Sequence, residues 1–228
     1  MNIKNMQISF SYFGSFDIFS NEKRIEISNT FSNNYRFQIQ NQIIGQQVQP
    51  TIIADNLNNT FKILFTNNRI DIIYTYSKPD EKLDKIVENI IFDIQKDIIN
   101  IFGSKFNRVA LNVVDFVFDS DEKYLQKFTN AFSMFENCGK CSEFDLRLNY
   151  IFKFNEVDFN SIINIKFGKV SNTNSLMTNE EKALILLYDI NSVVGELEKI
   201  NDISIDDIFN KLIDNYNEKN EIIESFLE

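Results

Sequence analysis

The stretch that decides the fold class is Asn107-Arg-Val-Ala-Leu-Asn-Val-Val-Asp-Phe-Val-Phe118, which contains four Val and two Phe. A run so rich in β-branched and aromatic residues predicts a long β-strand. The segment before it, residues 77–103, carries apolar residues at helical spacing instead. Strand and helix therefore follow one another in one folded unit, and 43% hydrophobic residues in a chain of 228 are enough to bury a core.

The segment before the strand has both a helix start and a helix stop. Ser77 can accept a hydrogen bond from a first-turn amide, Pro79 has a suitable fixed φ, and Asp80 is favoured by the positive end of the helix dipole. Gly103 can adopt the left-handed conformation that ends a helix. The apolar stripe between them consists of Leu83, Ile86, Val87, Ile90, Ile91, Ile94, Ile98 and Ile101.

Further strands are predicted on the N-terminal side of this helix. Apolar and polar residues alternate in residues 7–13, 24–27 and 35–40, and Asn67-Asn68 separates residues 61–65 from 69–76 as a hairpin turn. Residues 41–60 contain Pro50 and many amides, which favours a connection with only moderate strand character at Ile43-Ile44.

On the C-terminal side the pattern predicts helices at 121–136 and 204–227, strands at 143–154, 161–167 and 183–190, and a loop at 171–175. Strands joined by short turns and interrupted by helices predict an α+β protein. We expect a largely antiparallel sheet with three main helices on one face. The expected parts are two pseudo-similar halves, residues 1–118 and 119–228, which form one compact unit.

Both cysteines of the chain lie in Cys138-Gly-Lys-Cys141. This motif follows a predicted helix and precedes a strand, so Cys138 would meet the negative end of the helix dipole, which disfavours a thiolate. A tetrahedral zinc site needs four ligands, and the chain has two Cys and no His. We interpret the motif as a turn in which Gly139 ends the helix, with a four-cysteine site shared between two copies as the alternative.

The chain has no histidine, which excludes the commonest general base and every Ser-His or Cys-His nucleophile pair. Neither nucleotide-binding glycine motif is present. The sequence therefore predicts no enzyme, no cofactor and no metal. The alternative is an enzyme for phosphoryl or nucleic-acid chemistry that holds Mg²⁺ with Asp115, Asp119 and Asp121, although these residues also fit a strand end and a helix cap.

Negative charge is concentrated at the C-terminal end. Residues 180–228 contain thirteen Asp and Glu against four Lys, a net charge of −9 out of −10 for the chain. Such a surface repels nucleic acid and suits a basic protein, and its plain alternative is a solvated helix face. The expected partner-binding residues are Glu196, Glu198, Asp202, Asp206, Asp207, Asp214, Glu218, Glu221 and Glu224.

The order of helix, Arg108-Val-Ala-Leu-Asn-Val-Val-Asp115 strand and terminal helix resembles a sporadically distributed family of uncharacterised bacterial proteins of about 250 residues. Members carry a helix followed by an Arg-x-Gly-Leu-Arg-Tyr-x-Asn strand. Arg108 and Leu111 match that motif, whereas Asn112, Val113 and Asp115 depart from it. The family's patchy occurrence implies mobile or defence-related genes, and it supplies no catalytic residues.

These observations predict a non-catalytic protein that binds a macromolecule in the cytoplasm through its acidic C-terminal surface. A concrete form is a phage or mobile-element inhibitor of a nucleic-acid-targeting defence complex, such as a CRISPR effector. Binding to nucleic acid or membrane is not expected, because the acidic surface repels phosphates and no apolar run is long enough to cross a bilayer. A structural subunit that forms a homodimer through a sheet edge, such as residues 24–27, is a further alternative.

Overall fold

The computed structural model describes residues 4–44, 47–58, 60–76, 85–118, 122–131, 143–172, 179–193 and 202–227. In these ranges the protein has α+β architecture, with four helices and one sheet of nine strands. The strands are β1 Lys4–Phe13, β2 Tyr35–Ile44, β3 Gln47–Asn56, β4 Phe61–Phe65, β5 Arg69–Thr75, β6 Arg108–Phe118, β7 Phe144–Phe154, β8 Val157–Asn172 and β9 Asn179–Ser192. The helices are α1 Asn21–Phe31, α2 Lys85–Phe102, α3 Lys123–Ala131 and α5 Ile205–Leu227.

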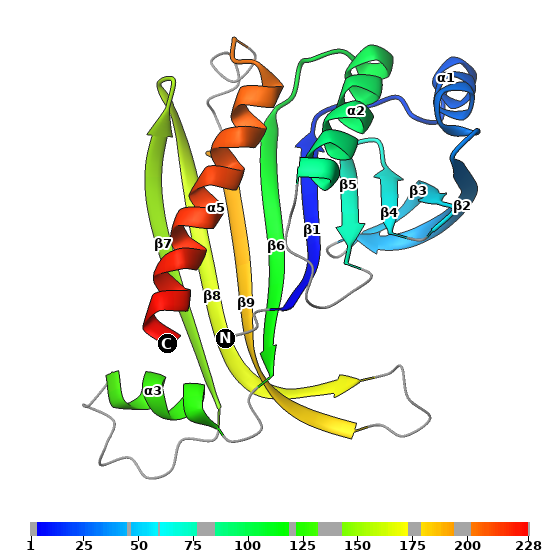
Figure 1. Cartoon of the computed structure of the whole chain (residues 1–228). Helices are drawn as coiled ribbons and strands as arrows, with labels where there is room; N and C mark the ends of the chain where they lie inside the picture. Colours follow the sequence, from blue (N-terminus) through cyan, green and yellow to red (C-terminus); the bar gives the residue numbers. More distant parts are fainter. Residues whose placement is uncertain are drawn as a thin grey trace.

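The sheet is antiparallel throughout, in the order β2-β3-β4-β5-β1-β6-β9-β8-β7 (Figure 1). Strand β1 pairs with β5 on one side and with β6 on the other, so Phe10 lies between Ile72 and Leu111. The predicted long strand, β6, thus lies next to the central strand β1 and is buried at alternate positions.

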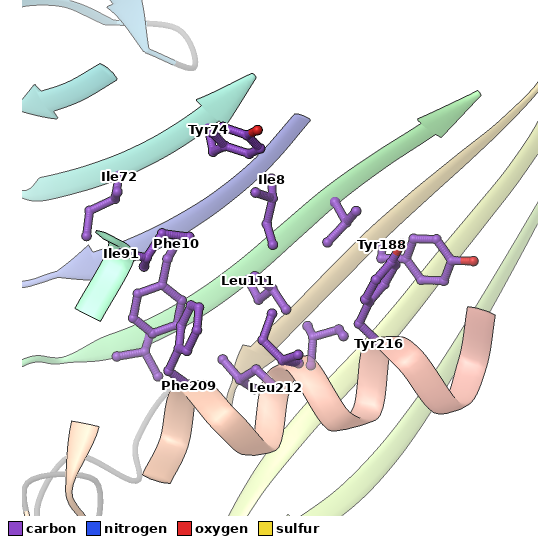
Figure 2. Close-up of a cluster of buried hydrophobic side chains, with 14 of the residues drawn as sticks. Ile8, Phe10, Ile72, Tyr74, Ile91, Leu111, Tyr188, Phe209, Leu212 and Tyr216 are labelled. Carbon is purple, nitrogen blue, oxygen red and sulfur yellow. The ribbon is translucent and has the colours of Figure 1, made fainter. Parts of the chain in front are cut away.

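The core lies between one face of the sheet and the helices α2 and α5 (Figure 2). Phe10 of β1 packs edge to face on Phe209 of α5, with ring centroids 4.8 Å apart. Tyr12, two residues further along β1, donates a 2.6 Å hydrogen bond to Gln95 Oε1 of α2. Because residues two apart in a strand share a face, one side of β1 anchors both helices. No helix among the described residues is long and apolar enough to cross a membrane.

Residues 24–27, predicted as a strand, lie in helix α1, so that prediction was wrong. The side chain of Ser20 caps this helix by accepting from the amide of Lys23 at 3.3 Å. Ile27 and Phe31, four residues apart, are buried, whereas Ile25 is 59% exposed. Four residues that alternate between apolar and polar are compatible with a strand or with one turn of a helix. The cap at Ser20 and the four-residue spacing of Ile27 and Phe31 favour the helix.

Residues 41–60 were predicted as a connection and instead contain strand β3, which pairs with β2 along its whole length. Pro50 lies within β3, opposite Asn41. On its other side β3 pairs with β4 only from Ile52 to Asp55, so Pro50 interrupts no ladder there. The hairpin of β2 and β3 therefore tolerates a proline that sequence reasoning took as a strand breaker.

Gly103 ends α2 as expected: its φ is +81° and its amide donates to the Ile99 carbonyl at 2.7 Å. A Cβ at this position would meet no atom within 4 Å, so steric crowding does not oppose a side chain. We predict that Gly103→Ala lowers the free energy of unfolding by about 1 kcal/mol, through backbone strain alone. Urea denaturation measures this, with Ser104→Ala as the neighbouring control, and an unchanged midpoint would contradict it.

Candidate functional site

The candidate site is the outer surface of α5, and its inner surface explains why this helix stays docked. The helix begins with a hydrogen bond of 3.0 Å from the Ile208 amide to the Ser204 carbonyl. Its inner residues recur at helical spacing and are buried against the sheet. They are Ile208, Phe209, Leu212, Ile213, Asn215, Tyr216, Ile223 and Leu227.

Four of the predicted partner-binding residues form one row along the outer surface of α5. Asp207, Asp214, Glu218 and Glu221 are all exposed. Their spacings of seven, four and three residues place them on the same side of a helix. We call these four residues the acidic row. The structure therefore brings together carboxylates that span most of the helix length.

The other predicted acids lie elsewhere. Asp206 accepts a 2.5 Å hydrogen bond from Gln95 Nε2 and so faces α2. Glu224 is half-buried and accepts from the Asn220 amide at 3.2 Å. Asp202 is exposed ahead of the helix, whereas Glu196 and Glu198 lie outside the described residues. Helical periodicity accounts for the bond between Asn220 and Glu224, which lie four residues apart, whereas the bond from Gln95 to Asp206 comes from the tertiary structure.

Two lysines partly neutralise the acidic row: Lys219 through a hydrogen bond to Glu218, and Lys211, which lies between Asp207 and Asp214 on the same side of α5, through its charge. Lys219 Nζ lies 2.8 Å from Glu218 Oε1, and this hydrogen bond lowers the pKa of Glu218. Glu218 is 64% exposed, so the pair is solvated and weak. Lys219 also lies over the Tyr150 ring of β7, 5.4 Å from its centroid. Lys219 therefore also connects the helix to the sheet.

Beneath α5 lies Asp115 of β6, which is fully buried. Its Oδ2 accepts a 2.8 Å hydrogen bond from the Tyr216 hydroxyl, while its Oδ1 has no partner among the described residues. Burial raises the pKa of Asp115 to about 7, with a smaller contribution from Glu224, and the Tyr216 hydrogen bond opposes the rise. Asp115 is thus an interior group that holds α5.

This position bears on the predicted magnesium site. Asp115 lies on the sheet face that α5 covers, and its partners Asp119 and Asp121 lie outside the described residues. Within the parts of the chain that the structure describes, no three His, Cys, Asp or Glu side chains gather as metal ligands would. The Cys138-Gly-Lys-Cys141 motif also falls outside the described residues.

Two polar contacts under α5, one buried and one partly buried, were not predicted. Ser161 donates to Asn215 Oδ1 at 2.7 Å, and the Tyr188 hydroxyl donates to Asn220 Oδ1 at 2.9 Å. Asn215 follows the inward-facing Leu212 by three residues, so a polar residue at an inward helical position was the available signal. These bonds fix the rotation of α5 and hence the direction in which the acidic row points.

Arg108, which carries part of the family resemblance, lies on the opposite side of the sheet from Val109. Its guanidinium and that of Arg69 each lie 5.1 Å from the Phe13 ring centroid. Arg69 also donates to Asp71 Oδ1 at 2.7 Å. No protein-family model and no curated protein matches this chain.

Proposed function

We propose that the protein is a non-catalytic binding protein that docks on a basic surface of another macromolecule through the acidic row. The observation that carries this proposal is that Asp207, Asp214, Glu218 and Glu221 point to solvent from a helix whose inner surface is anchored at Asp115 and Asn215. A fixed row of carboxylates attracts a surface of opposite charge and determines the orientation in which that surface docks. It also increases the rate at which the two partners meet.

The chemistry of the row indicates the class of partner. Proteins that bind nucleic acid expose clustered Lys and Arg, so they match such a row, whereas nucleic acid itself is repelled. We therefore propose that the protein acts in the cytoplasm. Its proposed role is that of a phage or mobile-element inhibitor of a nucleic-acid-targeting defence complex, such as a CRISPR effector. This assignment rests on charge complementarity and on the absence of histidine from the sequence.

The proposal predicts the effect of a quadruple variant that carries Asp207→Asn, Asp214→Asn, Glu218→Gln and Glu221→Gln. We expect it to fold normally, because all four side chains are exposed. Its affinity for the partner should fall about tenfold or more, and the remaining binding should depend less on salt. Affinity capture from the native cell at low and high salt, followed by mass spectrometry, provides the measurement.

The matched control removes four negative charges elsewhere, through Asp17→Asn, Glu22→Gln, Asp93→Asn and Glu143→Gln, all of which are exposed residues. The control should retain the partner. Equal loss with both variants would show that only net charge matters, and retention by both would contradict docking through the acidic row. A nuclease assay of the wild-type chain with Mg²⁺ tests the alternative enzyme that uses Asp115, Asp119 and Asp121.

We also propose that the two parts of the chain follow one plan, with the longer helices on one face of the sheet. In support, β1 is followed by helix α1 and strands β2 to β5, and the last of these strands, β5, pairs with β1. Likewise β6 is followed by α3 and by strands that return to pair β9 with β6. On this plan the second unit begins with β6, ahead of the boundary at residue 118 that the sequence suggested.

A further inference from the structure

Strand β7 forms one end of the sheet, with no strand beyond it in the described part of the chain. It is eleven residues long and pairs with β8 along its full length without a register shift. It contains no proline. Proteins protect an edge strand by making it short, bulged or proline-containing, by pointing a charge inward, or by placing charged side chains on it, as Asp145, Arg147 and Lys153 are placed on β7. Strand β7 has none of the first three forms of protection.

An inward charge is also missing, because every β7 residue on the helix-covered side is apolar. These residues are Phe144, Leu146, Leu148, Tyr150, Phe152 and Phe154. None of them is fully buried, and Tyr150 is 45% exposed. The part of α5 next to β7 adds apolar surface. Lys219 lies over Tyr150, and Ile222 and Phe226, three and seven residues further along the same side of the helix, are 59% and 42% exposed.

We propose that β7 pairs antiparallel with β7 of a second copy of this chain, about a two-fold axis at Asn149, so that the two sheets become one. In this register the numbers of two opposed residues add up to 298, so all eleven residues of β7 are paired. Opposed side chains then lie on the same face of the joined sheet. Phe144 lies opposite Phe154, Leu146 opposite Phe152, and Leu148 opposite Tyr150. Each partly exposed apolar side chain of β7 thereby gains a neighbour on the same face from its own copy.

The charges of the other face support the same register. Asp145 pairs with Lys166 of β8 at 2.9 Å, and Lys153 lies 3.9 Å from Asp158 of β8. In the dimer Asp145 lies opposite Lys153 of the second copy. Four adjacent strands then carry Lys166, Asp145, Lys153 and Asp158 in one line, with alternating sign.

A different register loses this match. An axis at Tyr150 would place Arg147 opposite Lys153 of the second copy, and like charges directly opposite each other destabilise a sheet. An axis at Leu148 would leave Lys153 and Phe154 beyond the end of the paired strand. An axis at Asn149 is therefore favoured by both charge and length. The inference is independent of the acidic row, because none of its four residues lies on β7.

A pair of substitutions at Ile151 tests this dimer. Ile151 is 70% exposed and would lie opposite Arg147 of the second copy. Ile151→Glu should tighten the dimer and Ile151→Lys should weaken it, with dissociation constants that differ about tenfold or more because the pair occurs twice. Sedimentation equilibrium of the full chain measures both, and circular dichroism confirms that both are folded.

The wild-type chain should reach the mass of two chains at a concentration of roughly 100 µM or below. A single-chain mass throughout that range would overturn the proposal. So would equal dissociation constants for the two variants, or particles that keep growing beyond two chains, because the latter would indicate pairing of β7 with β2 rather than with itself.

A disulfide test fixes the register. In a chain with Cys138→Ser and Cys141→Ser, Asn149→Cys would face its own copy across the axis, at the roughly 5 Å Cβ separation of a directly opposed pair. In the Arg147→Cys variant the two introduced cysteines would be offset by four residues along the paired strands. They would be roughly 13 Å apart, too far for a disulfide. Oxidation should cross-link the first variant and not the second, and equal cross-linking of both would overturn this register.

Discussion

Replacing Asp115 with Asn should leave stability almost unchanged near pH 4 and increase the free energy of unfolding by about 4 kcal/mol at pH 8. The reason is that burial raises the pKa of Asp115 from 3.8 to about 7. In the folded chain the carboxyl group keeps a proton that it has lost in the unfolded chain. The folded state must therefore bury a charge above pH 7, and the amide removes that penalty.

The direction of this pH dependence follows from proton binding by Asp115. Between about pH 4 and 7 Asp115 holds more of its proton in the folded state than in the unfolded state, so its contribution to wild-type stability falls as the pH rises. The contribution of Asp115 is fully present below its unfolded pKa and is lost as the pH passes its folded pKa. Urea denaturation of both proteins at matched pH values isolates it, because the other titrating groups largely cancel in the difference.

Tyr216→Phe is the control for this experiment. The Tyr216 hydroxyl donates to Asp115 Oδ2 and stabilises the carboxylate, so its removal should raise the pKa of Asp115 further. We expect this variant to lose the most stability above neutral pH, where Asp115 is charged and no longer receives that hydrogen bond. A destabilisation by Asp115→Asn of equal size at every pH would show that burial of the charge is not what limits stability.

The second large effect is expected at Phe209. This fully buried ring packs edge to face on Phe10 of β1 and on Phe92 of α2, with ring centroids 4.8 and 5.1 Å away. Phe209→Ala should lower the free energy of unfolding by about 3–5 kcal/mol, because it leaves a cavity where α5, α2 and the sheet meet. Urea denaturation measures the loss.

The neighbouring Asn210 is exposed and supplies the control. Asn210→Ala should change stability by less than about 0.5 kcal/mol. A loss of less than about 1 kcal/mol for Phe209→Ala would contradict the packing of α5 on the sheet. It would also weaken the case for the acidic row, whose direction depends on that packing.

The strongly periodic elements could be predicted from the sequence. The strands β1, β4, β5 and β6 and the helix α5 lie where apolar spacing indicated, because each has one face against the core. The strand order could not be predicted. Strands β1 and β6 are neighbours in the sheet although β2 to β5 and the helices α1 and α2 separate them in the chain, and no local pattern records that pairing.

The candidate site shows the same division. Helical spacing was sufficient to place Asp207 and Asp214 on the solvent side of α5. It did not show that Gln95 binds Asp206, or that Tyr216 binds Asp115 at a sequence separation of 101 residues. Those contacts depend on which sheet face the helix covers, which is a property of the whole fold.

The position of α5 in the chain also affects synthesis. This helix comes after all nine described strands in the sequence, and it covers the interior strands β6 and β9. While the ribosome is still adding α5, the apolar side of those strands has no cover, and uncovered strands are prone to aggregate. Completion of the core is therefore a late event, so translational pauses just ahead of residue 205 should make the nascent chain dependent on chaperones.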